Sequence, residues 1–186
     1  QKTMQRKLEI LVREIQEKNE VLNFISESDA LTGCMNRRGF IEKTLQMNRD
    51  HEGEELLILF ADLDHLKEIN DSFGHIEGDF SIRHCAEVLK KVVGADGIVG
   101  RIGGDEFCVV TLGNLKDGQQ IIERIREESD AFNCTSDKEY YVELSAGCTS
   151  VICRNGLVIA DALREADRAL YEVKKLRRNS VKKIRL

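Results

Sequence analysis

The sequence has no proline, no long apolar run and no excess of positive charge. Without proline, helices can run uninterrupted and proline cannot mark their boundaries. No stretch approaches the roughly 18 apolar residues of a membrane span, and no signal-peptide pattern opens the chain. The net charge of −5 argues against non-specific nucleic-acid binding, which depends on an excess of Lys and Arg. We therefore expect a cytoplasmic protein with no nucleic-acid partner.

The 186 residues fit one domain plus an appendage, and 41% hydrophobic content suffices for a core. The chain begins at Gln1 rather than Met. We therefore expect an upstream sensor domain that this sequence lacks, with a membrane anchor there as one form of the full-length protein.

No two of the six cysteines form a C-x-x-C pair. Zinc sites usually need such close ligand pairs, so we expect no zinc cluster. The cysteines are predicted to be reduced, and most of them to be small core residues. They stand at positions 34, 85, 108, 134, 148 and 153.

Residues 1–28 carry apolar side chains at steps of three and four, with Lys18 as the polar exception. This heptad seam predicts a two-stranded coiled coil. Lys18 at a seam position would weaken the pairing, which suits a coiled coil that switches register rather than one that stays tightly paired. The alternative is an amphipathic helix packed on its own domain; the narrow seam favours the coiled coil. The seam residues are Met4, Leu8, Leu11, Ile15, Leu22 and Ile25.

Residues 29–186 are predicted to form the globular domain. The continuous apolar run "ELLILFADLD", 55–64, is typical of a buried central strand that ends at a site. Strands mixed with helices indicate an α+β sheet covered by helices. Helices are expected at 38–48, 65–72, 76–93, 116–129 and 157–176, a hairpin at 98–111, a strand at 139–152, and a short last strand at 181–186.

The stretch "RIGGDEFCVV", 101–110, places Asp105 and Glu106 at the turn of an apolar hairpin. If this hairpin lies beside the strand that ends in Asp62, the carboxylates converge at one sheet edge. Such a group is unstable unless it is protonated or bound to a cation. Oxygen ligands select Mg²⁺, which substrate phosphates would complete. Taken alone, an acid pair at a turn is more often a solvated surface feature.

Other nucleotide and metal motifs fail. "DLDHLKEINDSF", 62–73, starts like a calcium loop, but Leu66, Lys67 and Phe73 occupy positions that need an oxygen ligand, a glycine and an acid. Neither a G-x-x-x-x-G-K-[ST] loop nor a G-x-G-x-x-G fingerprint is present. Any nucleotide site is therefore built without a P-loop.

Four ordered motifs together resemble GGDEF domains, the diguanylate cyclases of bacterial signalling, over about residues 29–180. The signature is "RIGGDEF", 101–107. "DALTGCMNRRGF", 29–40, is similar to the family's opening motif, and "DLDHLKEINDSFGHIEGD", 62–79, to its central one. "ADRALYEVKKLRRN", 166–179, is similar to its closing motif.

The resemblance implies a fold like the nucleotidyl-cyclase and polymerase palm, with a central, mostly antiparallel sheet wrapped by helices. It implies condensation of two GTP into cyclic di-GMP by a homodimer joined through the N-terminal helix. Two alternatives stay open: a non-catalytic GTP-binding regulatory module, and a synthase of mixed cyclic dinucleotides.

By position, the resemblance assigns Asp62, Asp105 and the Leu63 carbonyl to Mg²⁺, with Mn²⁺ as an alternative ion. Asp105 would activate the 3′-hydroxyl, with Glu106 as its acidic neighbour. Lys67 would neutralise phosphate charge.

The resemblance also implies a GTP site. Asn70 and Asp79 would bind guanine, whose N1–H and amine are both donors, and this favours GTP over ATP. The other implied contacts are His75, Gly103, Gly104, Lys174 and Arg178. Taken alone, each of these residues is also explained by a structural role, such as a helix cap for Asn70 or a solvated basic helix face for Lys174 and Arg178.

The sequence departs from the family pattern at a motif that concerns regulation. The family's product-binding motif, R-x-x-D, would begin at position 94, where the sequence reads "GADG". Gly94 and Gly97 replace the Arg and the Asp, and Asp96 is one residue out of register. We expect no feedback inhibition through this motif.

Overall fold

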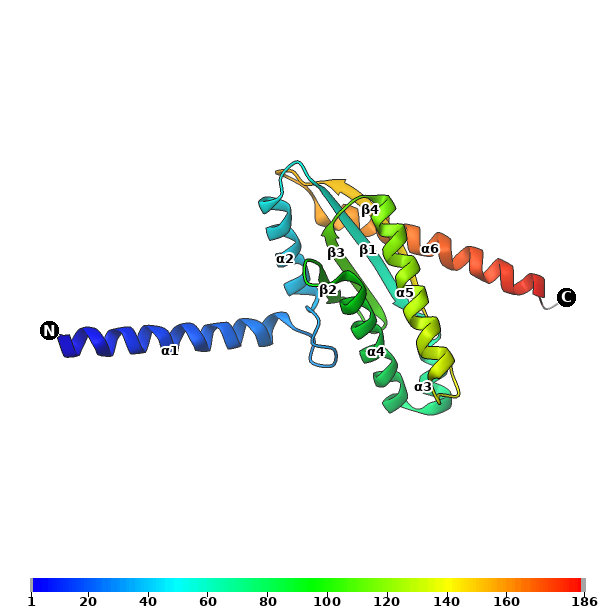
Figure 1. The fold of residues 1–186 in the computed structure, drawn as a ribbon, viewed down its shortest axis with the longest axis horizontal. Helices are drawn as coiled ribbons and strands as arrows, with labels where there is room; N and C mark the ends of the chain where they lie inside the picture. Colours follow the sequence, from blue (N-terminus) through cyan, green and yellow to red (C-terminus); the bar gives the residue numbers. More distant parts are fainter. Residues whose placement is uncertain (1, 185–186) are drawn as a thin grey trace.

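A computed structural model of the chain describes residues 2–184, except for the side chains of 2–4, 8–9, 17, 19–25 and 177–184. Figure 1 shows a long helix, α1, projecting from a body in which helices cover a sheet. The helices are α1 (Lys2–Glu27), α2 (Arg37–Asp50), α3 (Leu66–Phe73), α4 (His75–Val93), α5 (Leu115–Thr135) and α6 (Ile159–Ile184). The strands are β1 (Glu55–Leu63), β2 (Ile98–Arg101), β3 (Glu106–Leu112) and β4 (Leu144–Ile152).

The sheet has the order β2-β3-β1-β4, and each of these neighbouring pairs is antiparallel. β1 lies inside it, between β3 and β4. Successive residues of a strand point to opposite faces, yet Leu57 and Ile58 are both fully buried. Both faces of β1 are therefore covered, which explains its continuous apolar run and confirms the prediction of a central strand.

Helices cover the two faces in pairs (Figure 1). One face packs on α4 and α5, with Leu59, Leu89 and Ile125 in its core. The other packs on α2 and α6, with Phe40 and Ile58 in its core. This arrangement confirms the α+β class with a central antiparallel sheet wrapped by helices.

Two glycines let helices approach the sheet closely. A Cβ at Gly147 of β4 would lie 2.1 Å from the backbone nitrogen of Leu170 in α6. A Cβ at Gly100 of β2 would lie 2.7 Å from the Phe40 side chain of α2. Because real Cβ atoms do not approach other atoms this closely, these positions let α6 and α2 pack tightly on the sheet.

The structure near the C-terminus differs from the prediction made from the sequence. The expected last strand at 181–186 is wrong as far as Ile184, because α6 continues to that residue; the last two residues lie outside the described part. A helix that has nucleated propagates at little cost, and no proline or glycine interrupts the segment that follows Lys174. The strand expected from residue 139 begins at Leu144, and residues 136–143 form an irregular connector.

The described apolar side chains of α1 are exposed: Ile10 is 58%, Leu11 53%, Val12 46% and Ile15 51% accessible. This part of α1 therefore does not pack along its own domain, as Figure 1 also shows. Among the described helices, none has both the length and the apolar character needed to cross a membrane. All six cysteines are free thiols, and four are buried, as expected of core residues: Cys34, Cys85, Cys108 and Cys153.

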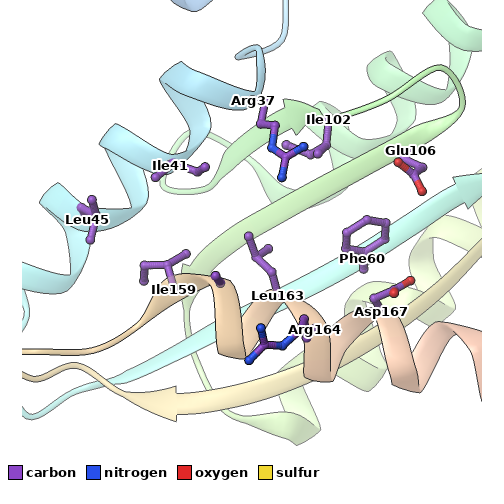
Figure 2. Close-up of a pocket in the computed structure, with 11 residues that line it drawn as sticks. Arg37, Ile41, Leu45, Phe60, Ile102, Glu106, Ile159, Leu163, Arg164 and Asp167 are labelled. Atoms are coloured by element: carbon purple, nitrogen blue, oxygen red, sulfur yellow. The ribbon is translucent and has the colours of Figure 1, made fainter.

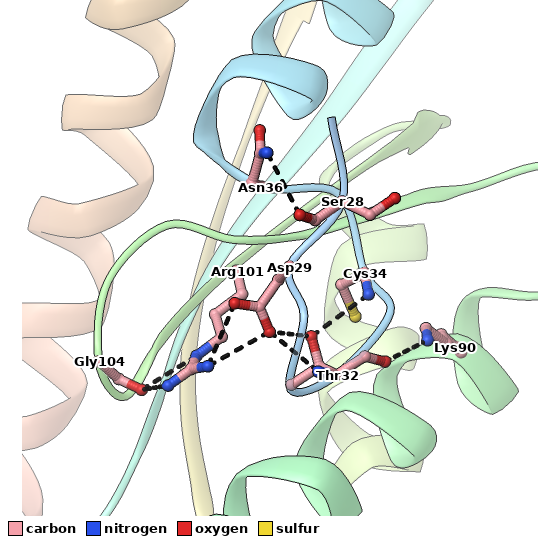
Figure 3. Close-up of polar contacts among 8 residues, drawn as sticks. All are labelled: Ser28, Asp29, Thr32, Cys34, Asn36, Lys90, Arg101 and Gly104. Atoms are coloured by element: carbon pink, nitrogen blue, oxygen red, sulfur yellow. Dashed lines mark hydrogen bonds and ion pairs between the residues drawn. The ribbon is translucent and has the colours of Figure 1, made fainter. Parts of the chain in front are cut away.

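A polar network joins the segment after α1 to the hairpin between β2 and β3 (Figure 3). The Asp29 carboxylate accepts hydrogen bonds from Thr32, at 2.9 Å from its backbone nitrogen and 2.7 Å from its hydroxyl. Arg101 Nη1 lies 3.2 Å from both Asp29 oxygens. The same guanidinium donates through Nη2 to the Gly104 carbonyl at 2.8 Å. Arg101 therefore links Asp29 to the turn that carries the two acids.

Backbone bonds hold this junction in register. Met35 donates to the Val99 carbonyl at 3.0 Å, and Arg101 donates to the Met35 carbonyl at 2.8 Å. The Asn36 amide donates to the Ser26 carbonyl at 2.7 Å, while its oxygen caps α2. The end of α1, the start of α2 and strand β2 are thus fixed to one another.

The pKa of Asp29 is lowered in the folded chain. Partial burial acts to raise this pKa, but hydrogen bonds from Thr32 and the hydrogen bond and charge of Arg101 outweigh it. A group with a depressed folded pKa stabilises the fold above its unfolded pKa, and that contribution is lost as the pH falls through the folded value. Asp29 is therefore expected to stabilise the fold at neutral pH.

We predict that Asp29→Asn lowers the free energy of unfolding by about 1–2 kcal/mol at pH 7, because Arg101 loses a charged partner. Urea unfolding should show the difference from wild type shrinking as the pH falls below 3.8, the ordinary aspartate pKa. Asp96→Asn, at an exposed position, is the matched control and should change stability by less than ~0.5 kcal/mol. Equal losses in both variants would contradict the assignment.

Candidate active site

Three acids meet where β1 ends. In the β1–β3 pairing, Asp62 lies directly opposite Glu106. By strand alternation, both belong to the face that packs on α2 and α6. The Leu63 backbone nitrogen donates to the Asp105 carbonyl at 3.0 Å, which fixes the hairpin turn to the end of β1. The register thus makes Glu106, rather than Asp105, the direct cross-strand neighbour of Asp62.

A lysine from α6 joins this cluster. Lys174 Nζ donates to Asp62 Oδ1 and lies 3.8 Å from Asp64 Oδ1. The Ser145 hydroxyl donates to Asp64 Oδ2 at 2.7 Å. The side chains of Asp62 and Asp64 are only 18% and 13% exposed, so they interact largely shielded from water.

Burial and neighbouring negative charges raise the pKa of two acids in the cluster. Burial raises the pKa of Asp62; the hydrogen bond and charge of Lys174 oppose this, and the charges of Asp105 and Asp64 add to it. Burial also raises the pKa of Glu106, helped by the charges of Asp105, Asp62 and Asp167. The carboxylates therefore repel one another, and Lys174 supplies compensating positive charge.

The donor set fits a divalent cation that is only partly held by protein. Carboxylate oxygens are ligands that Mg²⁺ prefers, and this ion usually keeps waters and binds substrate phosphates as well. No group of three or more Asp, Glu, His or Cys side chains among the described residues is arranged as a ready metal site. Any ion held by Asp62, Asp105 and Glu106 would therefore need oxygens of water and substrate as further ligands.

A second group of predicted residues lies at the corner between α3 and α4. Gly74, with φ of 89°, makes the corner. A Cβ at Gly78 would lie 1.9 Å from Asn70 Oδ1, so the Asn70 side chain rests against the first turns of α4. Asp79 and His75 are exposed on α4.

The other predicted residues are placed as follows. Lys67 is exposed near the start of α3. A Cβ at Gly103 would lie 2.5 Å from Glu106 Oε2, so this glycine leaves room for the Glu106 side chain. Gly104 is exposed and its carbonyl accepts from Arg101. Arg178 stands one turn after Lys174 on α6, but its side chain lies outside the description.

A cavity of about 560 Å³ adjoins the acids, between α2, the sheet and α6. Figure 2 shows Glu106 and Asp167 toward one end and Ile41 and Leu45 of α2 toward the other. Arg37 of α2 also lines it.

Sequence reasoning assigned no role to Arg37, Asp64, Arg101 or Asp167. All four stand inside the motifs quoted from the sequence. Their position within those motifs is the feature of the sequence that could have identified them as site residues.

Comparison with known proteins is consistent with this geometry. The sequence model of the family described as "Diguanylate cyclase, GGDEF domain" matches residues 26–180. The chain is 38% identical over 172 residues to the diguanylate cyclase DgcP of Escherichia coli K12, covering 90% of this chain and 50% of that protein. It is 30% identical over 173 residues to the cyclic di-GMP phosphodiesterase NbdA of Pseudomonas aeruginosa PAO1, covering 91% of this chain and 22% of that protein. The chain thus spans half or less of these relatives.

The fold has a similar solved structure. The crystal structure of the coiled coil and GGDEF domain of DgcB from Caulobacter crescentus, in complex with c-di-GMP, matches with a TM-score of 0.80. The sequences are 24% identical, and the match covers 94% of each chain. Because the family match includes the whole sheet, the acid cluster and the α3–α4 corner, the chain belongs to the GGDEF domain family.

Proposed function

We propose that the chain is a diguanylate cyclase that condenses two GTP into cyclic di-GMP and releases two pyrophosphates. The observation that carries the proposal is the cluster of Asp62, Asp105 and Glu106 at the end of β1, in which burial and neighbouring negative charges raise the pKa of Asp62 and of Glu106. Phosphoryl transfer depends on positioning and charge neutralisation more than on covalent chemistry. Membership of the family supports the assignment.

In this proposal Asp62, Asp105 and the Leu63 carbonyl hold Mg²⁺, with Mn²⁺ as an alternative. Glu106, opposite Asp62, adds a third carboxylate. When bound, the ion would neutralise triphosphate charge and acidify the attacking 3′-hydroxyl. The Asp105 carboxylate accepts the proton of that hydroxyl.

Positive side chains hold the triphosphate. Lys174 now bonds to Asp62; once that carboxylate has another cationic partner, its ammonium can donate to phosphate oxygens. Arg178, one turn further along α6, and the exposed Lys67 supply further positive charge.

The α3–α4 corner recognises the base. Asp79 accepts from the N1–H and the exocyclic amine of guanine, and adenine lacks this pair of donors. Asn70 forms a further hydrogen bond with the edge of the guanine base, and His75 is close to these residues in sequence. This donor pattern favours GTP over ATP.

Activity requires two domains. Each bound GTP offers its 3′-hydroxyl to the α-phosphate held by the other domain, so the domains must face each other. We assign the pairing to residues 1–28, since Leu11 and Ile15 of the heptad seam are exposed. Residues 29–186 then form the catalytic domain, and an upstream sensor would set the geometry of the paired helices.

The first prediction is that the chain with GTP and Mg²⁺ yields cyclic di-GMP, identified by chromatography and mass spectrometry. Asp105→Asn keeps the size of the side chain but removes the base, so kcat should fall by about 10²–10⁴. Asp62→Ala should lower activity and shift its Mg²⁺ dependence to higher concentration. The control Asp96→Asn should leave the rate unchanged, and full activity in Asp105→Asn would refute the catalytic role.

Two alternatives have distinct outcomes. A regulatory module would bind GTP without forming product, a possibility raised by the likeness to a phosphodiesterase. A mixed-dinucleotide synthase would incorporate adenine when ATP and GTP are supplied together. Cyclic di-GMP as the sole product from that mixture would support our proposal over both.

A second prediction concerns the coiled coil. Leu11→Glu with Ile15→Glu places charges in the proposed seam and should yield monomers by analytical ultracentrifugation. Specific activity of this double variant should fall steeply on dilution, because two domains must then meet by diffusion. Gln16→Glu, exposed but outside the seam, is the control. If the double variant kept full activity at nanomolar concentration, the pairing role of α1 would be wrong.

A third prediction concerns product inhibition. Gly94 has φ of 78°, where an arginine would be strained, and a Cβ at Gly97 would lie 1.8 Å from Val93 Cγ1. We expect added cyclic di-GMP not to inhibit through this segment. Gly94→Arg with Gly97→Asp should not create inhibition, because the backbone would have to change. Inhibition of the wild type that Asp96→Asn relieves would show instead that Asp96 serves as the acid.

A further inference from the structure

The connector between α5 and β4 is bonded to the first turn of α4. Lys138 Nζ donates to Glu77 Oε2 at 2.6 Å. The Tyr140 hydroxyl donates to the same oxygen. Glu77 and Lys138 are each about one-third exposed, at 30% and 29%. Two donors from one loop therefore converge on a single carboxylate oxygen of α4.

The connector also contacts the aromatic side chains around the corner. The Tyr140 ring lies 5.0 Å from the ring of Phe73, the last residue of α3. Lys138 Nζ lies 4.3 Å from the centre of the Phe80 ring on α4. Both helices that meet at Gly74 are therefore in contact with the same loop.

The connector is itself anchored. The Asn133 amide of α5 donates to the Val142 carbonyl at 3.0 Å, and the Val142 nitrogen donates back to Asn133 Oδ1 at 2.9 Å. Val142 is buried in the core. Lys138 and Tyr140 thus extend from a loop that is fixed at its far end.

The corner has little burial of its own. Ile76 is 81% exposed and Phe73 is 39% exposed. Contacts from the connector fall between the two proposed base-binding residues: Phe73 is three residues after Asn70, and Glu77 is two before Asp79. The connector is therefore placed to fix the relative position of Asn70 and Asp79.

We propose that Tyr140 and Lys138 are positioning residues for guanine recognition: by holding Glu77, they fix the α3–α4 corner so that Asn70 and Asp79 are preset for the base. This inference rests on the proposed function of the chain. It assigns specificity to a loop that the sequence motifs do not include.

The pKa shifts of Glu77 and Tyr140 favour the protonation states that this contact needs. Hydrogen bonds from Lys138 and Tyr140 lower the pKa of Glu77, so it is a carboxylate at neutral pH. Burial and the bond to Glu77 raise the pKa of Tyr140 to about 12, so its hydroxyl stays protonated and can donate. At neutral pH the acceptor on Glu77 and the donor on Tyr140 are therefore both in the form that this contact requires.

The test is Tyr140→Phe in the full chain, which removes the donor and keeps the ring against Phe73. The KM for GTP should rise about fivefold with kcat within about twofold, since the chemistry lies elsewhere. GTP affinity, measured by calorimetry without turnover, should weaken by a similar factor. Tyr141→Phe, whose side chain is 71% exposed, is the matched control and should match wild type.

A second pair of variants tests the shared oxygen. Glu77→Gln and Lys138→Met should each raise the KM for GTP. Because Tyr140 acts through Glu77, the double variant Glu77→Gln/Tyr140→Phe should be no worse than the more severe single variant. Additive losses would show that Tyr140 does not act through Glu77.

Inosine triphosphate separates positioning from plain stability. It lacks the exocyclic amine, so a well-placed Asp79 should favour GTP over it, and Tyr140→Phe should narrow that preference. A loss of stability alone would lower kcat and leave both KM and the preference unchanged, which would overturn the inference. A wild type that neither binds GTP nor forms product would overturn the proposed function and this inference together.

Discussion

Carboxylates lie close together at the end of β1, and the surrounding fold has to hold them there against their mutual repulsion. Asp62 and Glu106 face each other across neighbouring strands, and burial together with the charge of Asp105 raises the pKa of both. Water would screen the repulsion between these carboxylates, but their side chains are partly buried. The fold maintains the cluster because the strands are fixed by a core on each face of the sheet, and because Lys174 brings an opposite charge from α6.

The same constraint gives the surrounding elements their roles. The close approach of α6 to β4 at Gly147 sets the path of α6, which carries Lys174 beside Asp62. The hairpin turn is held from the other side by Arg101, which bonds both Asp29 and Gly104. Since Asp29 follows α1 closely in sequence, a change at the end of α1 has a short bonded route to the acids.

The residues that we propose for base recognition and those that we propose for the chemistry belong to different parts of the fold. The acids belong to the sheet, where the register is fixed by strand pairing. Asn70 and Asp79 belong to the helical corner between α3 and α4, where Asn70 lies against Gly78 and the connector bonds to Glu77. This division explains why substitutions in the connector are expected to affect binding more than catalysis.

The sequence alone predicts most of the helices and strands, including the central strand. Local periodicity reveals these features, since i to i+3 or i+4 contacts and strand alternation involve near neighbours. It misread residues 181–184, where a helix already formed simply continues. Three contacts emerge only from the packing of the chain: Glu106 lies opposite Asp62, Lys174 pairs with a carboxylate 112 residues earlier, and Tyr140 bonds to Glu77. Those contacts depend on how helices pack on the sheet, and no local pattern in one sequence encodes a partner so far along the chain.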